Sequence, residues 1–258
     1  MPRRKEKGPW FWRGAIALML TSVFGLFAAA AMNEPPPVNP ETNCRLDRLD
    51  PAHTVVLIDQ SDPFNETDVD WVRALLEDEA RQLPKHGRMT MIVPSSASPF
   101  DPKTMFSACS PGSAAGANPI FQNPRMIEQA WRARFHTPMM EAADEVLIDT
   151  VAPSSPLLEA VYVLSGRADF QGQVPARRLI VVSDLMQHSK DFSMYRTGTA
   201  YEPFEASPLN ERRPGLGGVE VVARIVPRPE YPLPLEDVKA FWKRWLEEAD
   251  AASFLSVT

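Results

Sequence analysis

Hydrophobic residues along the chain follow two alternating spacings. Short continuous apolar runs, of which 177–184 is the clearest, alternate with longer stretches in which apolar residues recur every three or four positions. The first spacing is typical of strands buried on both faces, and the second is typical of amphipathic helices. The predicted strands are 53–59, 88–93, 104–109, 177–184 and 219–226, and the predicted helices are 65–83, 124–148, 156–170 and 235–252.

Strands that alternate with helices predict an α/β fold, a doubly wound and mostly parallel sheet flanked by helices. We expect this domain to span residues 53–252, followed by a short tail at 253–258. Pro138 is expected to break the helix at 124–148, because proline removes a backbone donor. Residues 188–218 show neither spacing and are expected to form long loops.

A different apolar segment precedes this domain. Residues 14–32 carry no charge, and their length is close to the roughly 20 residues that a helix needs to cross a bilayer. They follow a basic segment, 1–13, which is expected to remain cytoplasmic because Lys and Arg are retained on that side. The sequence therefore predicts a single-pass signal anchor and a periplasmic or extracellular body. The alternative is a cleaved signal peptide, since Ala28–Ala31 offer the small residues of a cleavage site, and the body would then be secreted.

Charge and proline content divide the chain in a similar way. The 258 residues carry a net charge of −6 and include 26 prolines. Residues 1–32 hold five basic residues and one acid, a charge of +4, so the rest of the chain carries −10. A Pro-rich linker is predicted at 33–52 and should be extended and stiff. The acidic body argues against nucleic acid as the main partner.

The two cysteines, Cys44 and Cys109, lie in segments rich in Pro, Ser and Asn. Export would place them in an oxidising compartment, where a disulfide persists. A structural disulfide between them is the preferred interpretation. The alternative is two unrelated small residues.

Oxygen-bearing side chains follow two of the predicted strands. Asp59 and Ser61 come after the first strand, Asp184 ends the strand at 177–184, and Ser155 opens a predicted helix. In doubly wound sheets, ligands bind beyond the carboxyl ends of the strands, so these side chains are expected at one rim. Carboxylate and hydroxyl oxygens suit Mg²⁺, or alternatively Mn²⁺ or Ca²⁺.

In this order, the chain resembles a von Willebrand factor A (VWA) domain over residues 53–252. That family carries a metal-ion-dependent adhesion site, written D-x-S-x-S, with a later Thr and a later Asp. Asp59 and Ser61 match the first two positions, Ser155 matches the Thr, and Asp184 matches the last Asp. Pro63 replaces the second Ser, so the site is degenerate. The resemblance implies a protein-binding module whose cation is completed by an acidic group of the partner, a protein in the membrane or periplasm.

Other interpretations use the same residues. Ser155 is also expected to cap the helix that follows it, and Asp59 and Asp184 are capable of capping neighbouring helices. A metal-free domain would serve as a structural subunit of an envelope or secretion-type assembly. A hydrolase is the third reading, but the sequence has neither a G-x-S-x-G elbow nor a Gly-rich phosphate loop, so we expect no enzyme.

The long segment at 188–218 concentrates aromatic residues and arginines, which are typical anchors of protein interfaces. It is a candidate partner-binding loop. The alternative is that these side chains pack back on the sheet. The candidates are Phe192, Tyr195, Tyr201, Arg212 and Arg213.

Overall fold

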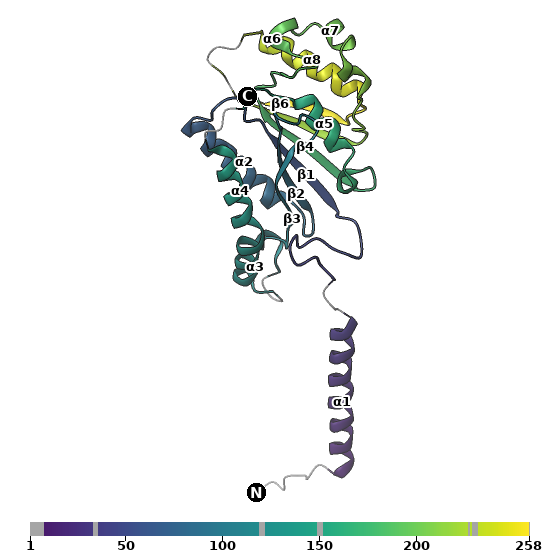
Figure 1. Ribbon diagram of the computed structural model, residues 1–258. Helices are drawn as coiled ribbons and strands as arrows, with labels where there is room; N and C mark the ends of the chain where they lie inside the picture. The colour runs from purple at the N-terminus through teal and green to yellow at the C-terminus, as the bar shows by residue number, and fades with distance from the viewer. Residues whose placement is uncertain are drawn as a thin grey trace. The chain divides into compact units, whose positions relative to one another are not determined.

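A computed structural model describes residues 8–32, 36–118, 122–148, 152–226, 228 and 232–257 (Figure 1). The chain divides into two units, Met1–Pro37 and Val38–Thr258. Parts of the predicted basic segment (1–7) and of the predicted linker (33–35) lie outside the described residues.

The first unit contains helix α1, Pro9–Met32. It begins before residue 14, so that the helix includes the aromatic residues Trp10, Phe11 and Trp12. Its segment Trp10–Ala28 is long and apolar enough to cross a membrane, with a mean hydropathy of 1.6. This agrees with the apolar spanning segment that the sequence predicts.

The second unit is built on a six-stranded sheet with the order β3-β2-β1-β4-β5-β6. Neighbouring strands run parallel except for β2 and β3, which are antiparallel. This confirms the predicted fold class, a doubly wound and mostly parallel sheet. The strands are β1 Ala52–Ile58, β2 Arg88–Val93, β3 Lys103–Cys109, β4 Ala176–Ser183, β5 Val219–Ile225 and β6 Ser253–Val257.

Helices cover both faces of this sheet (Figure 1). Alternate residues of β1 enter two separate cores, because successive side chains of a strand point to opposite faces. Val55 and Leu57 pack with helices α5 (Leu157–Ser165) and α8 (Leu235–Glu248). Val56 and Ile58 pack with the helices of the other face, which are α2 (Glu66–Gln82), α3 (Pro124–Trp131) and α4 (Thr137–Leu147).

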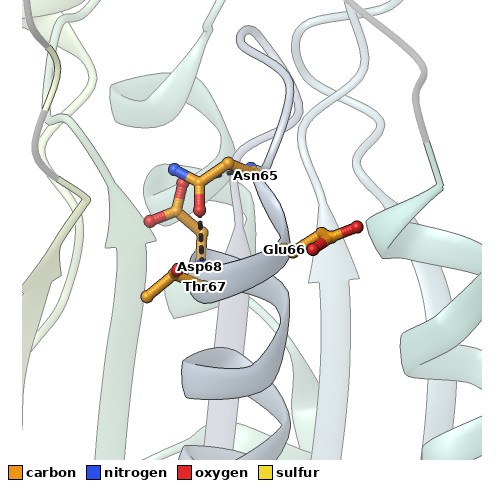
Figure 2. A pocket seen from close by; sticks show the side chains of 4 residues that line it. All are labelled: Asn65, Glu66, Thr67 and Asp68. Carbon is orange, nitrogen blue, oxygen red and sulfur yellow. Dashed lines mark hydrogen bonds between the residues drawn. The ribbon is translucent and has the colours of Figure 1, made fainter.

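Helix α2 begins with a capping box, in which two side chains satisfy backbone donors that the first turn leaves free (Figure 2). The Asn65 side chain accepts a hydrogen bond from the Asp68 backbone N–H at 3.0 Å, and the Asp68 carboxylate accepts one from the Asn65 N–H at 3.2 Å. Together with Glu66 and Thr67, these residues line an open hollow at the surface. The capping bonds explain why α2 starts at this point of the chain, and they use polar groups of Asn65 and Asp68 in the hollow.

The predicted helix at 124–148 is interrupted earlier than the sequence indicates. A π-helical turn, η2, occupies Arg132–His136 between α3 and α4. Pro138 has no N–H to donate one turn back, and its ring crowds the carbonyl there. A widened turn directly before the proline relieves both problems.

Short elements fill segments for which the sequence predicts loops or longer helices. The helix expected at 156–170 ends at Ser165, and a 3₁₀ turn, η3, follows at Ala168–Phe170. The segment predicted as loops, 188–218, contains α6 Met194–Thr197, α7 Tyr201–Glu205 and η4 Pro208–Glu211. A further 3₁₀ turn, η1 Ala114–Gly116, lies between β3 and α3.

The expected tail at 253–258 is wrong as a description of Ser253–Val257, which forms the edge strand β6. Its backbone pairs with β5 in parallel register from Glu220↔Ser253 to Arg224↔Val257. The strand is too short and too weakly apolar for its spacing to be recognised in sequence. Backbone pairing with β5 holds this strand in the sheet, and Phe254 packs against the core beside it.

A disulfide joins Cys44 and Cys109, as the sequence predicts. It ties the segment before β1 to the end of β3. Backbone hydrogen bonds reinforce this connection, including Cys109 N–H to the Thr42 carbonyl at 2.8 Å. The segment that enters the second unit is therefore fixed to the sheet along much of its length.

Candidate functional site

Asp59 and Asp184 follow two neighbouring parallel strands, β1 and β4. Ile58 is paired with Val182 at the end of both strands, and the Asp59 N–H donates to the Val182 carbonyl at 2.9 Å. Because both strands run in the same direction, both carboxylates come to the same edge of the sheet. This edge holds the four predicted ligands, and we call it the rim: Asp59, Ser61, Ser155 and Asp184.

The buried Asp59 carboxylate is the centre of the rim, with only 4% of the residue exposed. The Ser155 hydroxyl donates to its Oδ2 at 2.7 Å, and the Ser61 N–H donates to its Oδ1 at 3.0 Å. The Ser183 hydroxyl donates to the same Oδ2 at 2.8 Å. The structure therefore brings Asp59, Ser61 and Ser155 together across 96 positions of sequence.

Ser183 belongs to this cluster, although the sequence interpretation did not include it. The signal was present, since Ser183 directly precedes Asp184 at the end of a buried strand. In a parallel pair, residues that lie in register point to the same side of the sheet. The register of β1 with β4 places Ser183 beside Asp59.

The expectation that Ser155 caps the following helix is wrong. Pro156 occupies the N-cap position of α5, and the Ser155 hydroxyl is directed to Asp59 instead. The backbone N–H of Leu158 donates to the side-chain oxygen of Gln187 at 2.9 Å. A residue from the loop after β4 thus provides the cap, and Ser155 remains at the rim.

The charges at the rim are unfavourably placed without a counter-ion. Burial raises the pKa of Asp59 above its usual value. Burial also raises the pKa of Asp184 to about 6, and the nearby carboxylates of Asp59 and Asp62 push it in the same direction. The Met186 N–H donates to Asp184 Oδ1 at 2.9 Å and opposes this rise. Two buried carboxylates that repel each other favour binding of either a proton or a cation.

The donor set fits a hard divalent cation in kind, since it consists of carboxylate and hydroxyl oxygens. A pocket of about 230 Å³ opens beside it. Tyr195 forms part of the wall, and 54% of this residue is exposed. The pocket is lined by Ser61, Asp62, Ala152, Pro153, Ser154, Ser155, His188 and Tyr195.

The loop that carries Pro63 is held by an arginine from beyond β5. Arg228 Nη1 donates to the Pro63 carbonyl at 3.0 Å, and Arg228 Nε lies 3.5 Å from Asp62 Oδ2. Asp62, which stands next to the missing Ser oxygen, is therefore already ion-paired. The Arg228 charge also lowers the pKa of Asp184, which partly offsets the repulsion at the rim.

The turn after Asp184 is held by hydrogen bonds from the end of β4 and from helix α8. Leu185 has a φ of 66°, which is unfavourable for a branched side chain and requires support from its surroundings. The Ser183 hydroxyl accepts from the Leu185 N–H at 2.9 Å, and Trp242 Nε1 of helix α8 donates to the Leu185 carbonyl at 2.8 Å. Next to this turn, Gln187 Nε2 donates to the buried Glu159 carboxylate at 2.9 Å. Buried polar contacts thus connect α5 and α8 to the rim.

The candidate partner-binding loop is mostly engaged within the domain. Phe192 and Tyr201 are buried in the core beneath α8. Arg212 stacks on the ring of Phe100 at 4.4 Å, and Arg213 pairs with Glu248. The alternative expectation, packing back within the domain, therefore describes Phe192 and Tyr201, whereas Arg212 and Arg213 remain exposed. Tyr195 alone keeps an exposed ring, at the rim pocket.

Known proteins give limited further information. No protein-family model matches the chain, and no curated protein matches it. A solved structure of an aerotolerance-related membrane protein from Bacteroides fragilis is 12% identical, with a TM-score of 0.40, over 80% of this chain and 92% of that one. The ArnB paralog VWA2 from Sulfolobus acidocaldarius is 12% identical, with a TM-score of 0.38, over 81% and 42%. The pilus adhesin SpaC from Lactobacillus rhamnosus is 8% identical, with a TM-score of 0.46, over 84% and 29%.

The raised pKa of Asp184 predicts a pH-dependent stability. In the folded chain its pKa is about 6, against 3.8 for the free group, so between these values the folded state holds a proton that the unfolded state has released. The contribution of Asp184 to the free energy of unfolding should fall as pH rises through this interval, by at most about 3 kcal/mol. Burial lowers the pKa of His53 to about 4, so this histidine acts in the opposite direction over the same interval. Chemical denaturation at about pH 4 and about pH 7, without divalent cations, measures this difference.

The Asp184→Asn variant is the control for this prediction, because the amide does not titrate. The change in unfolding free energy from about pH 4 to about pH 7 should therefore be more positive than in the wild type, by up to about 3 kcal/mol. The change that remains belongs to other shifted groups, which include His53, Asp59 and Glu159. A difference equal to that of the wild type would contradict the assignment to Asp184.

Proposed function

We propose that the second unit is a VWA-like protein-binding module, tethered to a membrane by α1, which binds its partner through a divalent cation at the rim. The observation that carries this proposal is the pair of buried carboxylates at one sheet edge, beside serine hydroxyls and an open pocket. Such a pair is costly to keep ionised without a counter-ion. A function that places a cation there accounts for the arrangement.

In this function, Asp59 and Asp184 supply negative charge, and Ser61 and Ser155 supply hydroxyl oxygens, directly or through water. Bound Mg²⁺ or Mn²⁺ would supply a positive charge to which an acidic side chain of the partner is attracted. Tyr195 lines the pocket, and its neutral phenol is able to donate a hydrogen bond. We assign this tyrosine to the contact with the partner.

The position of the rim within the second unit suits a tethered binding module. The chain enters this unit at Val38 and reaches the amino end of β1 at Ala52. The rim lies at the carboxyl ends of β1 and β4, which is the opposite end of the sheet. Within the second unit, the binding surface is therefore separated from the amino end of β1 by the length of the strand. We propose that this unit is exported to the periplasm or the cell exterior, with residues 1–7 on the cytoplasmic side.

A second candidate function is a metal-free structural subunit of an envelope or secretion-type assembly. It is favoured by Pro63, which offers no side-chain oxygen, and by Arg228, which already places a positive charge near the carboxylates. We propose binding rather than catalysis in both cases. His188, the histidine at the pocket, uses Nδ1 in a hydrogen bond with Ser193 and packs its ring against Tyr195.

Addition of Mg²⁺ or Mn²⁺ to the purified full chain is expected to raise its melting temperature. A cation that binds only the folded state at a concentration of 100 times its Kd adds about 2.7 kcal/mol to the free energy of unfolding. Asp59→Asn should abolish the shift, because the amide keeps the shape but loses the charge. Asp101→Asn, the same change at an exposed loop position, should keep it.

Capture of the partner is measured in the same variants by crosslinking in membranes, with and without chelator. Loss of capture both on chelation and in Asp59→Asn supports the cation-dependent function. An unchanged melting temperature in the wild type, together with capture that resists chelation, would leave the metal-free function instead.

A further inference from the structure

An exposed patch of leucines and cations lies at the end of the sheet opposite the rim. Leu46 and Leu49 are 67% and 52% exposed, although most leucines of the second unit are buried. Basic residues alternate with them, and the loop before β2 adds a lysine. We call this surface the proximal patch, formed by Arg45, Leu46, Arg48, Leu49 and Lys85.

The proximal patch is a fixed surface. The disulfide holds Cys44 to Cys109, directly before Arg45. Two backbone hydrogen bonds connect the neighbouring loops, His86 N–H to the Ser110 carbonyl at 2.7 Å and Ser110 N–H to the Gly87 carbonyl at 2.8 Å. The segment with the leucines and the loop with Lys85 are therefore both anchored to the end of β3. Two exposed leucines three positions apart thus stand beside cations on a segment that the disulfide anchors.

The patch is positively charged within an acidic unit. Arg45 pairs with Asp47, and the adjacent Arg88 pairs with Asp50. Among the residues that the structure describes, neither Arg48 nor Lys85 forms an ion pair, so their charges face solvent. The pKa of His86 between them is lowered by burial and by the charges of Lys85, Arg45 and Arg48, which places these cations close together.

Chain connectivity limits how far this patch can be from the end of α1. The residues 33–37 separate Met32 from Val38, and a chain of this length spans at most about 20 Å. Within the second unit, Val38 pairs with Arg45 in an antiparallel bridge, directly beside Leu46. The leucines therefore lie next to the first residue of this unit, at the point to which the tether leads.

We infer that the proximal patch binds the surface of the membrane that α1 spans. Leu46 and Leu49 enter the interfacial layer, and Arg48 and Lys85 bind anionic lipid headgroups. This inference rests on the proposed membrane tether, and it adds a second contact that limits rotation of the unit about its linker. The rim, at the other end of the sheet, would then be directed away from the bilayer.

Photocrosslinking of the full chain in vesicles tests this contact. The crosslinking amino acid p-benzoylphenylalanine replaces Leu46, Leu49 or, as the control, Leu255, which is 55% exposed on edge strand β6. We expect lipid adducts at positions 46 and 49 at several times the yield at 255. The yield should be higher in vesicles that contain phosphatidylglycerol than in phosphatidylcholine alone. Equal yields at the three positions would overturn the inference.

Charge removal gives a second, independent measurement. Arg48→Gln/Lys85→Gln should lower lipid crosslinking in the anionic vesicles by about fivefold for each cation lost. Lys190→Gln/Lys243→Gln removes the same charge elsewhere in the unit and should leave the yield unchanged. An equal yield in both double variants would overturn the role of the two cations. Flotation of the chain with the vesicles is followed in parallel, and a chain that fails to float contradicts the tether itself rather than the patch.

Discussion

The variant Cys44→Ala/Cys109→Ala is expected to lose about 4 kcal/mol of unfolding free energy relative to the oxidised wild type. The bridge connects residues 65 positions apart. A cross-link that closes a loop of that size lowers the conformational entropy of the unfolded chain and so raises the unfolding free energy by about 4 kcal/mol. Both cysteines are buried, and alanine leaves no unsatisfied polar group in their place. The loss should therefore reflect the missing cross-link, with a smaller contribution from the two deleted sulfur atoms.

Chemical denaturation of the full chain, with and without reductant, measures this effect. Reductant should destabilise the wild type by a similar amount and leave the double variant unchanged. A loss below about 1 kcal/mol would mean that the unfolded state is little restricted by the bridge. Because Cys44 also anchors the proximal patch, the double variant should show weaker lipid crosslinking at Leu46 as well.

The central strands could be predicted from sequence because burial on both faces leaves a continuous apolar run. The runs at 53–59 and 177–184 differ from β1 and β4 by one residue at each end. Edge strand β6 escaped this reasoning, because its stability comes from backbone pairing with β5 and its residues have no spacing of their own. The pattern of apolar side chains in a sequence indicates which strands are buried. It does not directly indicate which segments pair through their backbones.

The rim was predictable in part for a similar reason. Strand order places Asp59 and Asp184 at one edge, and this much follows from their positions at the ends of two buried runs. The position of Ser155 at the rim was also expected, but the expectation that it caps α5 was wrong, because its hydroxyl can reach either α5 or Asp59. In the structure, the Ser155 hydroxyl bonds to Asp59, and Gln187 caps α5 in its place. Sequence spacing alone does not reveal that Gln187, from a distant loop, replaces Ser155 as the capping acceptor.

For the loops at 188–218, composition alone did not show whether their aromatic residues are buried or exposed. Aromatic residues and arginines are typical both of interfaces and of small cores, and composition does not distinguish the two. In the structure, the rings of Phe192, Tyr201 and Phe204 pack on Phe241 of helix α8. The aromatic stripe of α8, recognisable in sequence, was therefore the surface that these loops cover. Once that pairing is known, the candidates that remain exposed for a contact with a partner are Tyr195, Arg212 and Arg213.

A buried indole in α8 connects this helix to the rim, and its removal should have a large effect on stability. Trp242 is 1% exposed, packs edge-on against Trp245, and donates its N–H to the Leu185 carbonyl at 2.8 Å. Trp242→Ala leaves a cavity between α8 and the sheet and is expected to lower the free energy of unfolding by about 4 kcal/mol. Thermal and chemical denaturation of the full chain measure this loss.

Trp242→Phe separates packing from the hydrogen bond, because phenylalanine keeps most of the apolar contact and loses the donor. We expect a cost of about 1 kcal/mol for the lost bond. The turn at Leu185, with its unfavourable φ, should relax, so that the stabilisation by Mg²⁺ should weaken as the position of Asp184 becomes less defined. Trp245→Phe, an equally buried change on the same helix, makes no described hydrogen bond to this turn and should keep the full response to Mg²⁺. Equal responses to Mg²⁺ in the two phenylalanine variants would show that α8 supports the fold without positioning the rim.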